Sequence, residues 1–524
     1  MAQYGSYYIK IRLIPNTSDV NMVGGASRKT TVSYTGDTTY VKPTTVTTTD
    51  GYGNKTQESF YNGTVTSANL INQNKYKYDL QGNMIESIGG RVYMEGLGDY
   101  STKTEYDYAG RPTKEYRADG NYITTEYDKL GNVTSTTDYM GNTTTYTYDK
   151  LGRQISVTAP FEDGITTQSL TYYDKNGNII MSKQQNNKIG ESVSYTQAEN
   201  EYDSRNRIVS TKVNDGTSDI YTQYAYDSMG NMTKTVTGHT EKISDLYGEI
   251  PETATYTEYE YDRFGNVTKE TDSLGNSRTA GYNLYGAPTV QTDKNGVEFY
   301  YSYNEYGSPI LVLNDDDNYR ITYSYNVYNM PIGQWDFVES RLNRSSYDAF
   351  GYVAEERDVK NNIINAYTND VNGNRKRLEV KDNGTVVMTA DYTYDIRDRL
   401  TNVSFNGGSA SVSYTYDANG NMLTGDGATY TYDARGRQSG VVKGTASASY
   451  TYYPTGLRKT KLAGGANTTF VWDGSNMVLE YTNSAASGKV YVYGLTLISQ
   501  GNSLYYIYNG HGDVVNILTA QVQC

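Results

Sequence analysis

The sequence is poor in several residue types on which familiar classes of protein depend. Its single cysteine, Cys524, is the last residue, which excludes an intrachain disulfide framework. The 524 residues include only 2 His, 2 Trp, 8 Phe and 9 Pro. No apolar run reaches the length of about 18 residues that a transmembrane helix needs. The first residues, MAQYGSYYIKIRL, lack the basic and uninterrupted apolar segments of a secretory signal.

The charge is acidic and evenly spread. The formal net charge is −13, and the 46 Lys and Arg residues are scattered along the chain rather than clustered. Nucleic acids and anionic membranes both favour a basic face. The sequence therefore argues against either as a partner.

Tyrosine and glycine are abundant instead, with 58 and 51 residues. Aliphatic residues are too few to build an ordinary core along the whole chain, so the buried surface must come largely from tyrosine rings. Each ring carries a hydroxyl that needs a partner or water. Low hydropathy alone is typical of disorder, but regular turns and a high aromatic content argue against it here.

A repeat organises nearly the whole chain, and Tyr261–Gly307 shows it most clearly. Turn glycines fall at 265, 275, 286, 296 and 307, and runs such as Val267–Thr271 lie between them. Short runs rich in Thr, Val and Tyr between such turns are typical of β-strands. Two turns, Tyr-Asp-x-x-Gly-Asn and Asp-x-x-Gly, make a unit of about 21 residues. The sequence therefore predicts a string of β-hairpins.

The Tyr-Asp element, or a variant of it, begins at eighteen positions, namely 78, 106, 127, 148, 173, 202, 226, 261, 282, 303, 325, 347, 369, 394, 416, 432, 453 and 472. Tyrosines also recur two residues earlier, as in Tyr146 and Tyr148, and so share a strand face. Stacked hairpins would line these rings up as tyrosine ladders. In the last two units, at Tyr453 and Trp472, the glycine falls one place early, at Gly456 and Gly474.

Substitutions show what the turn requires. Asn206, Asn329 and Asp398 stand where other units have glycine, and these residue types best tolerate a left-handed backbone. We expect a positive φ there, in a four-residue turn closed by a G1-type bulge. Asn replaces Asp at positions 283, 304 and 326, which indicates that this side chain accepts backbone hydrogen bonds. We assign structural turn roles to Tyr127, Asp128, Gly131, Tyr148, Asp149, Gly152, Tyr226, Asp227, Gly230, Tyr261, Asp262, Gly265, Tyr416, Asp417, Gly420, Tyr432, Asp433 and Gly436.

Three stretches depart from the period: Met181–Glu199, Gly238–Thr255 and Asn314–Asn318. Surface loops are favoured over binding loops for all three. The segment EKISDLYGEIPE within the second is compatible with one helical turn. We divide the chain into an irregular β region (1–75), a repeat region (76–467) and a more aliphatic C-terminal region (468–524).

The repeat units resemble those of a known family. Units such as YTYDKLGR (146–153) and YTYDARGR (430–437) resemble the YD repeats of the Rhs family. That family includes bacterial Rhs polymorphic toxins, the C component of insecticidal toxin complexes, wall-associated proteins and the animal teneurins. FVWDGSNMVLEY, YVYGLTLIS and YYIYNGHGDVVNILT resemble the start of the Rhs-associated core, so the resemblance covers about residues 76–519.

The resemblance implies an all-β fold, in which tandem hairpins form a long antiparallel sheet that spirals into a hollow or partial shell, a β-cocoon. In toxin members the shell encloses a C-terminal toxin that is released by self-cleavage at Asp-Pro-x-Gly-type motifs. This sequence departs from that pattern, because after Thr519 it reads Ala-Gln-Val-Gln-Cys. No catalytic aspartate can be carried over, and neither the cleavage element nor a toxin domain is expected in these residues.

Residues that suggest chemistry have simpler interpretations. Tyr-Asp pairs could form acid–base dyads, but catalysis needs one organised site rather than eighteen copies. His239 and His511 lack the converging ligands of a zinc site. Asn314–Asn318 (NDDDN) offers oxygens for Ca²⁺ without the spacing of an EF-hand. We therefore predict no catalytic, metal or cofactor-binding residues, no cofactor and no enzyme activity.

The first hypothesis for function is a structural shell that encloses, protects or delivers a C-terminal effector or toxin absent from this chain, secreted or displayed on a bacterial surface. A second is an extracellular adhesin, because exposed Tyr with Asn, Asp and Thr is also typical of glycan sites. A third is a self-assembling β-strip joined through open sheet edges.

Overall fold

The computed structural model describes residues 28–32, 43–62, 64–97, 100–162, 165–185, 195–214, 219–251, 254–294, 296–314, 319–453, 456–473, 476–482, 488–493, 497–500, 504–508 and 514–519. These residues form strands β1 to β44, with one short helix, α1 (Gly90–Met94), and one 3₁₀ turn, η1 (Ser67–Asn69). The all-β class expected from the sequence is confirmed.

The strands follow one another in a regular series. The first half comprises β1 Arg28–Val32, β2 Thr44–Thr49, β3 Lys55–Tyr61, β4 Leu70–Tyr78, β5 Met84–Ile88, β6 Thr102–Tyr106, β7 Pro112–Tyr116, β8 Tyr122–Tyr127, β9 Val133–Thr137, β10 Thr143–Tyr148, β11 Gln154–Glu162, β12 Ile165–Tyr173, β13 Ile179–Gln185, β14 Tyr195–Tyr202, β15 Ile208–Asn214, β16 Asp219–Tyr226, β17 Met232–His239, β18 Thr255–Tyr261, β19 Val267–Asp272, β20 Ser277–Tyr282, β21 Pro288–Thr292 and β22 Glu298–Tyr303. The second half comprises β23 Pro309–Asn314, β24 Arg320–Tyr325, β25 Pro331–Asp336, β26 Arg341–Tyr347, β27 Val353–Asp358, β28 Ile363–Asn369, β29 Arg375–Asp382, β30 Thr385–Tyr394, β31 Leu400–Phe405, β32 Ala410–Ser413, β33 Thr415–Tyr416, β34 Met422–Gly425, β35 Ala428–Tyr432, β36 Gln438–Lys443, β37 Ala446–Tyr452, β38 Arg458–Ala463, β39 Ala466–Asp473, β40 Asn476–Thr482, β41 Lys489–Tyr493, β42 Leu497–Gln500, β43 Leu504–Tyr508 and β44 Val514–Thr519.

Except between β32 and β33, each strand pairs antiparallel with the strand before it and the strand after it, so the strip is a meander of hairpins. A 32-stranded sheet holds β1 to β32 and a 12-stranded sheet holds β33 to β44. At the junction, the backbone N–H of Tyr414 still donates to the carbonyl of Thr401 on β31, at 2.9 Å. The two sheets are therefore successive lengths of one strip.

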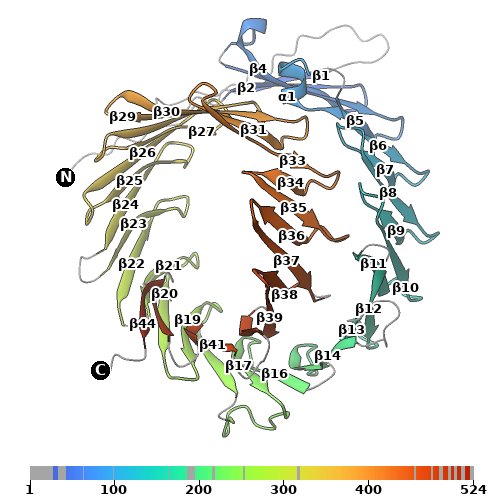
Figure 1. Cartoon of the computed structure of the whole chain (residues 1–524), viewed down its shortest axis with the longest axis vertical. Helices are drawn as coiled ribbons and strands as arrows, with labels where there is room; N and C mark the ends of the chain where they lie inside the picture. The colour runs from blue at the N-terminus through green and yellow to red at the C-terminus, as the bar shows by residue number, and fades with distance from the viewer. Residues whose placement is uncertain are drawn as a thin grey trace.

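The strip winds into a spiral of more than one turn (Figure 1). It descends along one side from β5 to β14, turns at β16 and β17, and rises on the opposite side from β19 to β29. It then crosses at β30 and β31 and descends a second time through β33 to β39, beside its first descent. The long antiparallel sheet expected from the sequence is thus confirmed.

The turns lie on two opposite edges of the strip, which we name separately. The Tyr-Asp edge carries the turns that join β2 to β3, β4 to β5 and so on to β30–β31, and then β33–β34 to β39–β40. The return edge carries the other turns, with α1 between β5 and β6. Both edges use the same turn where the sequence permits, as at Asp128–Asn132 and Asp138–Asn142.

The turn after β8 shows how the sequence dictates this geometry. The N–H of Asp128 donates to the carbonyl of Asn132 at 2.9 Å, and the N–H of Gly131 donates back to the carbonyl of Asp128 at 3.2 Å. Gly131 has φ +96°, and the ladder register shifts by one residue at Tyr127. This is the four-residue turn with a bulge that the repeat predicts. Asn206, Asn329 and Asp398 have φ of 60°, 60° and 59°, so the positive φ expected at those substitutions is observed.

One expectation about the repeat register was wrong. At the unit that we began at Tyr453, it is Tyr452 that pairs with Arg458, and Tyr453 occupies the Asp position. The N–H of Tyr453 donates to the carbonyl of Leu457, and the N–H of Gly456 donates to the carbonyl of Tyr453. The glycine is therefore in register, and a tyrosine has replaced the aspartate.

The irregular stretches were only partly anticipated. The described residues of 238–255 contain no helix, and the segment that was compatible with a helical turn instead has a turn at Asp245–Gly248. The short helix, α1, lies elsewhere, at a place where the sequence pattern had not indicated one. Residues 315–318, 186–194 and His511 lie outside the described residues.

Little of this structure is buried. Only ten hydrophobic side chains of the described residues are buried: Val46, Phe161, Val236, Ala254, Phe299, Val312, Ile321, Ala390, Val403 and Ala428. The chain exposes 31882 Å², whereas a compact monomer of this size exposes about 19,000 Å². A sheet that leaves both faces accessible accounts for this excess.

We predict that the left-handed turn position limits stability at single units. Gly307 has φ +80°, and an added Cβ would meet nothing within 4 Å. A Gly307→Ala substitution should therefore cost about 1 kcal/mol through backbone strain alone, measured as a lower midpoint in urea unfolding. Gly307→Asn is the matched control and should cost less, because Asn tolerates this backbone. Equal effects of the two substitutions would contradict this account.

Candidate functional site: the hairpin wall and its seam

Most Tyr-Asp turns are held by one carboxylate, whereas those of Asn283, Asn304 and Asn326 use an amide oxygen as the acceptor. In the unit of Asp262, the Oδ1 atom accepts the N–H of Phe264 at 2.8 Å and of Asn266 at 3.0 Å, and Oδ2 accepts the Asn266 side-chain amide at 2.8 Å. The side-chain hydrogen bond from Asn266 and the backbone donors lower the pKa of Asp262, although burial acts in the opposite direction. The carboxylate therefore stays ionised at neutral pH and orders its own turn.

In most units, the tyrosine before the turn is bonded to the previous repeat. Its hydroxyl donates to the carbonyl of the first residue of the strand that follows the previous Tyr-Asp turn. The distances are 2.6–2.9 Å for Tyr78, Tyr106, Tyr127, Tyr173, Tyr202, Tyr226, Tyr261, Tyr282, Tyr303, Tyr325, Tyr394, Tyr416, Tyr432 and Tyr452. Tyr347 makes the same bond to Pro331. A phenylalanine would pack in the same place but could not donate, which explains why tyrosine so outnumbers phenylalanine in this chain.

Two units keep this bond without tyrosine. The side-chain amide of Asn369 donates to the carbonyl of Val353 at 3.0 Å, and the indole N–H of Trp472 donates to the carbonyl of Arg458 at 2.7 Å. The position therefore requires a hydrogen-bond donor at the end of the side chain. In these units the hydrogen bonds join successive repeats along the tyrosine ladder.

In five units, an arginine that lies directly after the left-handed residue of the turn strengthens the link to the next repeat. Its Nε donates to the turn carboxylate at 2.6–2.7 Å, and its Nη1 donates to the backbone carbonyl at the Asp position of the next turn at 3.0–3.3 Å. Its guanidinium lies 4.4–4.9 Å from the centre of the next tyrosine ring. These residues are Arg111, Arg153, Arg207, Arg399 and Arg437.

The second turn of the spiral is joined to the first along a seam. There the return edge of the first descent meets the Tyr-Asp edge of the second. Arg91 of α1 donates from Nη1 to Asp398 Oδ1 and to the carbonyl of Asp395, both at 2.7 Å, and its Nε lies 3.3 Å from Asp370 Oδ2. The side chains of Arg91 and Asp370 are 8% and 3% exposed. The buried cation of Arg91 thus joins α1 to two turns that lie about 300 residues further along the chain.

Further polar contacts extend the seam at the same spacing. Arg397 Nη1 lies 3.0 Å from Asp119 Oδ2, and the Asn419 amide donates to Asp138 Oδ2 at 2.9 Å. The Nε of Arg435 donates to the carbonyl of Pro160 at 2.9 Å. The seam hydrogen bonds join residues 275 to 307 positions apart. This interval measures one turn of the spiral.

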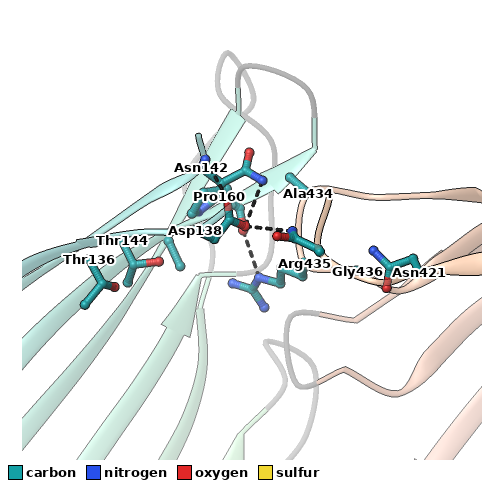
Figure 2. Close-up of a pocket in the computed structure, with 11 residues that line it drawn as sticks. Thr136, Asp138, Asn142, Thr144, Pro160, Asn421, Ala434, Arg435 and Gly436 are labelled. Carbon is teal, nitrogen blue, oxygen red and sulfur yellow. Dashed lines mark hydrogen bonds between the residues drawn. The ribbon is translucent and has the colours of Figure 1, made fainter. Parts of the chain in front are cut away.

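Figure 2 shows a pocket that crosses the seam, with Asp138, Asn142 and Pro160 on one side and Ala434, Arg435 and Gly436 on the other. Asp138 Oδ2 also accepts the Asn142 amide, at 3.0 Å. Burial opposes ionisation of Asp138, but the hydrogen bonds from Asn142 and Asn419 outweigh it and keep the pKa low. The charged groups of this pocket form the contacts that join the two edges, so the pocket has a structural role.

The structure places the turn residues expected from the sequence on one edge. The turns of Asp128, Asp149, Asp227 and Asp262 follow β8, β10, β16 and β18, which lie on the first turn of the spiral. Of the six units assigned from the sequence, those of Asp417 and Asp433 lie at the seam. Arg91, Asp119 and Asp138 escaped sequence reasoning, because their partners lie hundreds of residues away and no local motif marks them.

The described residues do not bring metal-binding side chains together around His239. His239 is 2% exposed, its Nδ1 lies 2.6 Å from the carbonyl of Glu241, and its ring stacks on Tyr221. Among the described residues, no group of three His, Cys, Asp or Glu side chains could hold a metal ion. The described part of the chain also has no helix long and apolar enough to span a bilayer.

Known proteins share this architecture. The RHS Repeat family model matches residues 127–161. Two curated relatives are the tRNA3(Ser)-specific nuclease WapA of Bacillus spizizenii, 29% identical over 182 residues, and the tRNA nuclease WapA of Bacillus subtilis, 27% identical over 182 residues. Each match covers 33% of this chain and 7% of the relative, so the chain spans a small part of their length.

Solved structures match over most of the chain. The crystal structure of TcdB2-TccC3-Cdc42 has a TM-score of 0.55 at 16% identity, and covers 91% of this chain and 27% of its own. The Tc holotoxin pore of Photorhabdus luminescens has a TM-score of 0.51 at 15% identity, with the same coverage. This likeness concerns the fold.

The repeats, the meander and the seam define the class of protein as a hairpin-repeat shell, a structural fold built as a wall. Within that class, the chain contains repeats of the RHS Repeat family, whose model matches residues 127–161.

We predict that the tyrosine hydroxyl contributes to stability independently of the ring. Tyr416→Phe removes the donor to the carbonyl of Leu400, which lies 2.8 Å away, and should cost about 1 kcal/mol. Urea unfolding, with hydrogen exchange at β31 and β33, measures the effect. Tyr108→Phe is the control, because the Tyr108 side chain is fully exposed. A Tyr416→Phe protein as stable as this control would show that the hydroxyl bond has no net value.

We also predict that Arg91 holds the seam. Arg91→Met leaves Asp370 buried without its cation, which should cost about 3–5 kcal/mol locally. Hydrogen exchange should accelerate at the turns 370–374 and 395–399 while β19–β22 stay unchanged. Lys443→Met removes an exposed ion pair with Asp426 and should change stability by less than about 1 kcal/mol. Unaltered exchange at both turns would mean that Arg91 does not hold the seam.

Proposed function

We propose that this chain is the wall of a container that encloses, protects or delivers an effector polypeptide carried outside these residues. One observation carries the proposal: a sheet one layer thick winds through more than one turn and is joined to itself by a seam. The wall itself would have no catalytic role. Such a container acts outside the cell or at its surface.

The lack of packing on the sheet faces supports an interior that is open to a guest. Along β10, exposed and half-buried side chains alternate, and no residue of that strand is buried. The half-buried face carries Tyr146 and Tyr148 and the exposed face carries threonines. A lining of Tyr, Thr, Asn and Gln offers hydrogen bonds and rings but little aliphatic surface. It suits a guest that is confined without being packed into a native interface.

The names of the relatives agree with this role. Two curated relatives are named as tRNA nucleases, and one matched solved structure is a Tc holotoxin pore. Because the match spans only 7% of either nuclease, we do not extend that activity to this chain. The effector proposed here is a separate polypeptide or segment.

Protection of a guest is the expected result of an encapsulation experiment. A small, protease-sensitive reporter domain is joined after Cys524, and its rate of cleavage is compared with that of the free reporter. The fused reporter should be cut much more slowly, and low-resolution particle images should show a hollow wall with added density inside it. A reporter joined before Met1 serves as the matched control.

The seam variant makes this test specific. Arg91→Met combined with Arg397→Met should restore fast cleavage, because it opens the joint between the two descents while leaving each hairpin intact. A fused reporter that is cut as fast as the free reporter in the unmodified chain would refute the container.

A further inference from the structure

At the seam, contact is made by the tips of the Tyr-Asp turns. We use "tip" for the two residues between the Asp and the Gly of such a turn. On the second turn of the spiral the tips include Phe350, Arg397, Asn419 and Arg435. Phe350 packs edge-on against Phe60 with ring centres 6.4 Å apart, and the other three make the polar seam contacts. A tip on this edge is therefore the element that docks on a return edge.

One spiral turn earlier, the same positions carry exposed apolar side chains. We call this set the apolar row, and its members are 58–102% exposed: Tyr52, Leu80, Tyr108, Leu130, Leu151, Met229, Phe264, Leu284, Tyr285 and Tyr306. Successive tips are two strands apart, or about 10 Å. The row has two stretches, Tyr52 to Leu151 and Met229 to Tyr306, separated by the polar tips Lys175, Asn176, Ser204 and Arg205. Apolar groups repeated at that spacing along one edge mark an interaction site more often than scattered exposed residues do.

The return edge carries a matching set beyond the residues that form the seam. We call it the return row: Tyr247, Leu274, Phe337, Val338 and Val359, which are 38–66% exposed. These residues lie in turns after β17, β19, β25 and β27, whereas the seam uses return turns from α1 to Pro160. The chain thus exposes an apolar row and a return row, which lie on the same two edges that meet each other at the seam.

We propose that the apolar row of one copy docks on the return row of a second copy, so that two spirals stack head to tail. The observation behind this is continuity with the seam, since the same two edges meet there with the same polarity. The contact is heterologous, because each partner uses a different surface. It involves turn tips rather than the terminal strands that an open sheet edge would offer.

The charge of the chain determines how this association responds to salt. Each copy has a net charge of −13, and like charges repel. Screening should weaken the repulsion and leave the apolar contact intact. We therefore expect the mass of the assembly to rise with both protein and salt concentration.

Two variants and their mixture test the proposal. Leu130→Asp with Leu151→Asp places charges in the apolar row, and Phe337→Asp with Val338→Asp places them in the return row. Sedimentation velocity should show either variant alone as a monomer. An equimolar mixture should form a dimer that grows no further, because each variant supplies the surface that the other lacks. Val442→Lys, an exposed position on β36 outside both rows, is the control and should associate like the unmodified chain.

The mixture also reports on folding, since a misfolded variant could not supply its intact row. Three results would overturn the proposal: an unmodified chain that stays monomeric at every protein and salt concentration, association that persists in both variants, or a mixture that remains monomeric.

Discussion

The structure depends first on the hydrogen bonds that an aspartate makes to the residues two and four positions after it, together with a residue of positive φ at the third position. These bonds close a tight turn whose bulge shifts the register by one residue and directs the preceding tyrosine toward the previous hairpin. Asn at positions 283, 304 and 326 preserves the acceptor, and Asn or Asp preserves the left-handed backbone where glycine is missing. The turn therefore survives changes in charge and in side-chain size, provided that one acceptor and one tolerant backbone remain.

A wall built in this way obtains its stability locally. Pairing is between neighbouring strands, the tyrosine hydroxyl reaches one repeat back, and the arginine after the turn reaches one repeat forward. Each unit supports its neighbours, so the strip can extend without a central core. This explains how a sequence with few aliphatic residues forms a stable structure, and why its faces stay accessible. The same property that prevents a packed core makes the strip suitable as a container wall.

The winding of the strip adds a constraint that no single repeat sets, which is the number of residues in one turn of the spiral. The interval of 275 to 307 residues across the seam sets the circumference, and it brings Arg91 to Asp370 and Asp398, and Asp138 to Asn419. The seam is mostly polar and charged, in contrast to the exposed apolar tips on the first turn of the spiral. Polar contacts suit a joint made inside one chain, where the tether has already lowered the entropic cost of association. Apolar tips suit contact between separate molecules, where the surface buried must supply the affinity.

The sequence by itself determined the turn, its left-handed position and the all-β class, because these depend on residues close to one another in the chain. It also determined the repeat period, because the same local motif recurs along the chain. It also indicated a resemblance to the Rhs family, through units such as 146–153 and 430–437. It could not reveal the partner of the tyrosine hydroxyl, the Tyr452 register or the short helix that carries Arg91, because each depends on a neighbouring repeat or on a distant turn. Only the tertiary structure decided which turns meet and which stay exposed. That outcome depends on the small twist and bend of each hairpin accumulated over one turn of the spiral, and no local motif encodes such a sum.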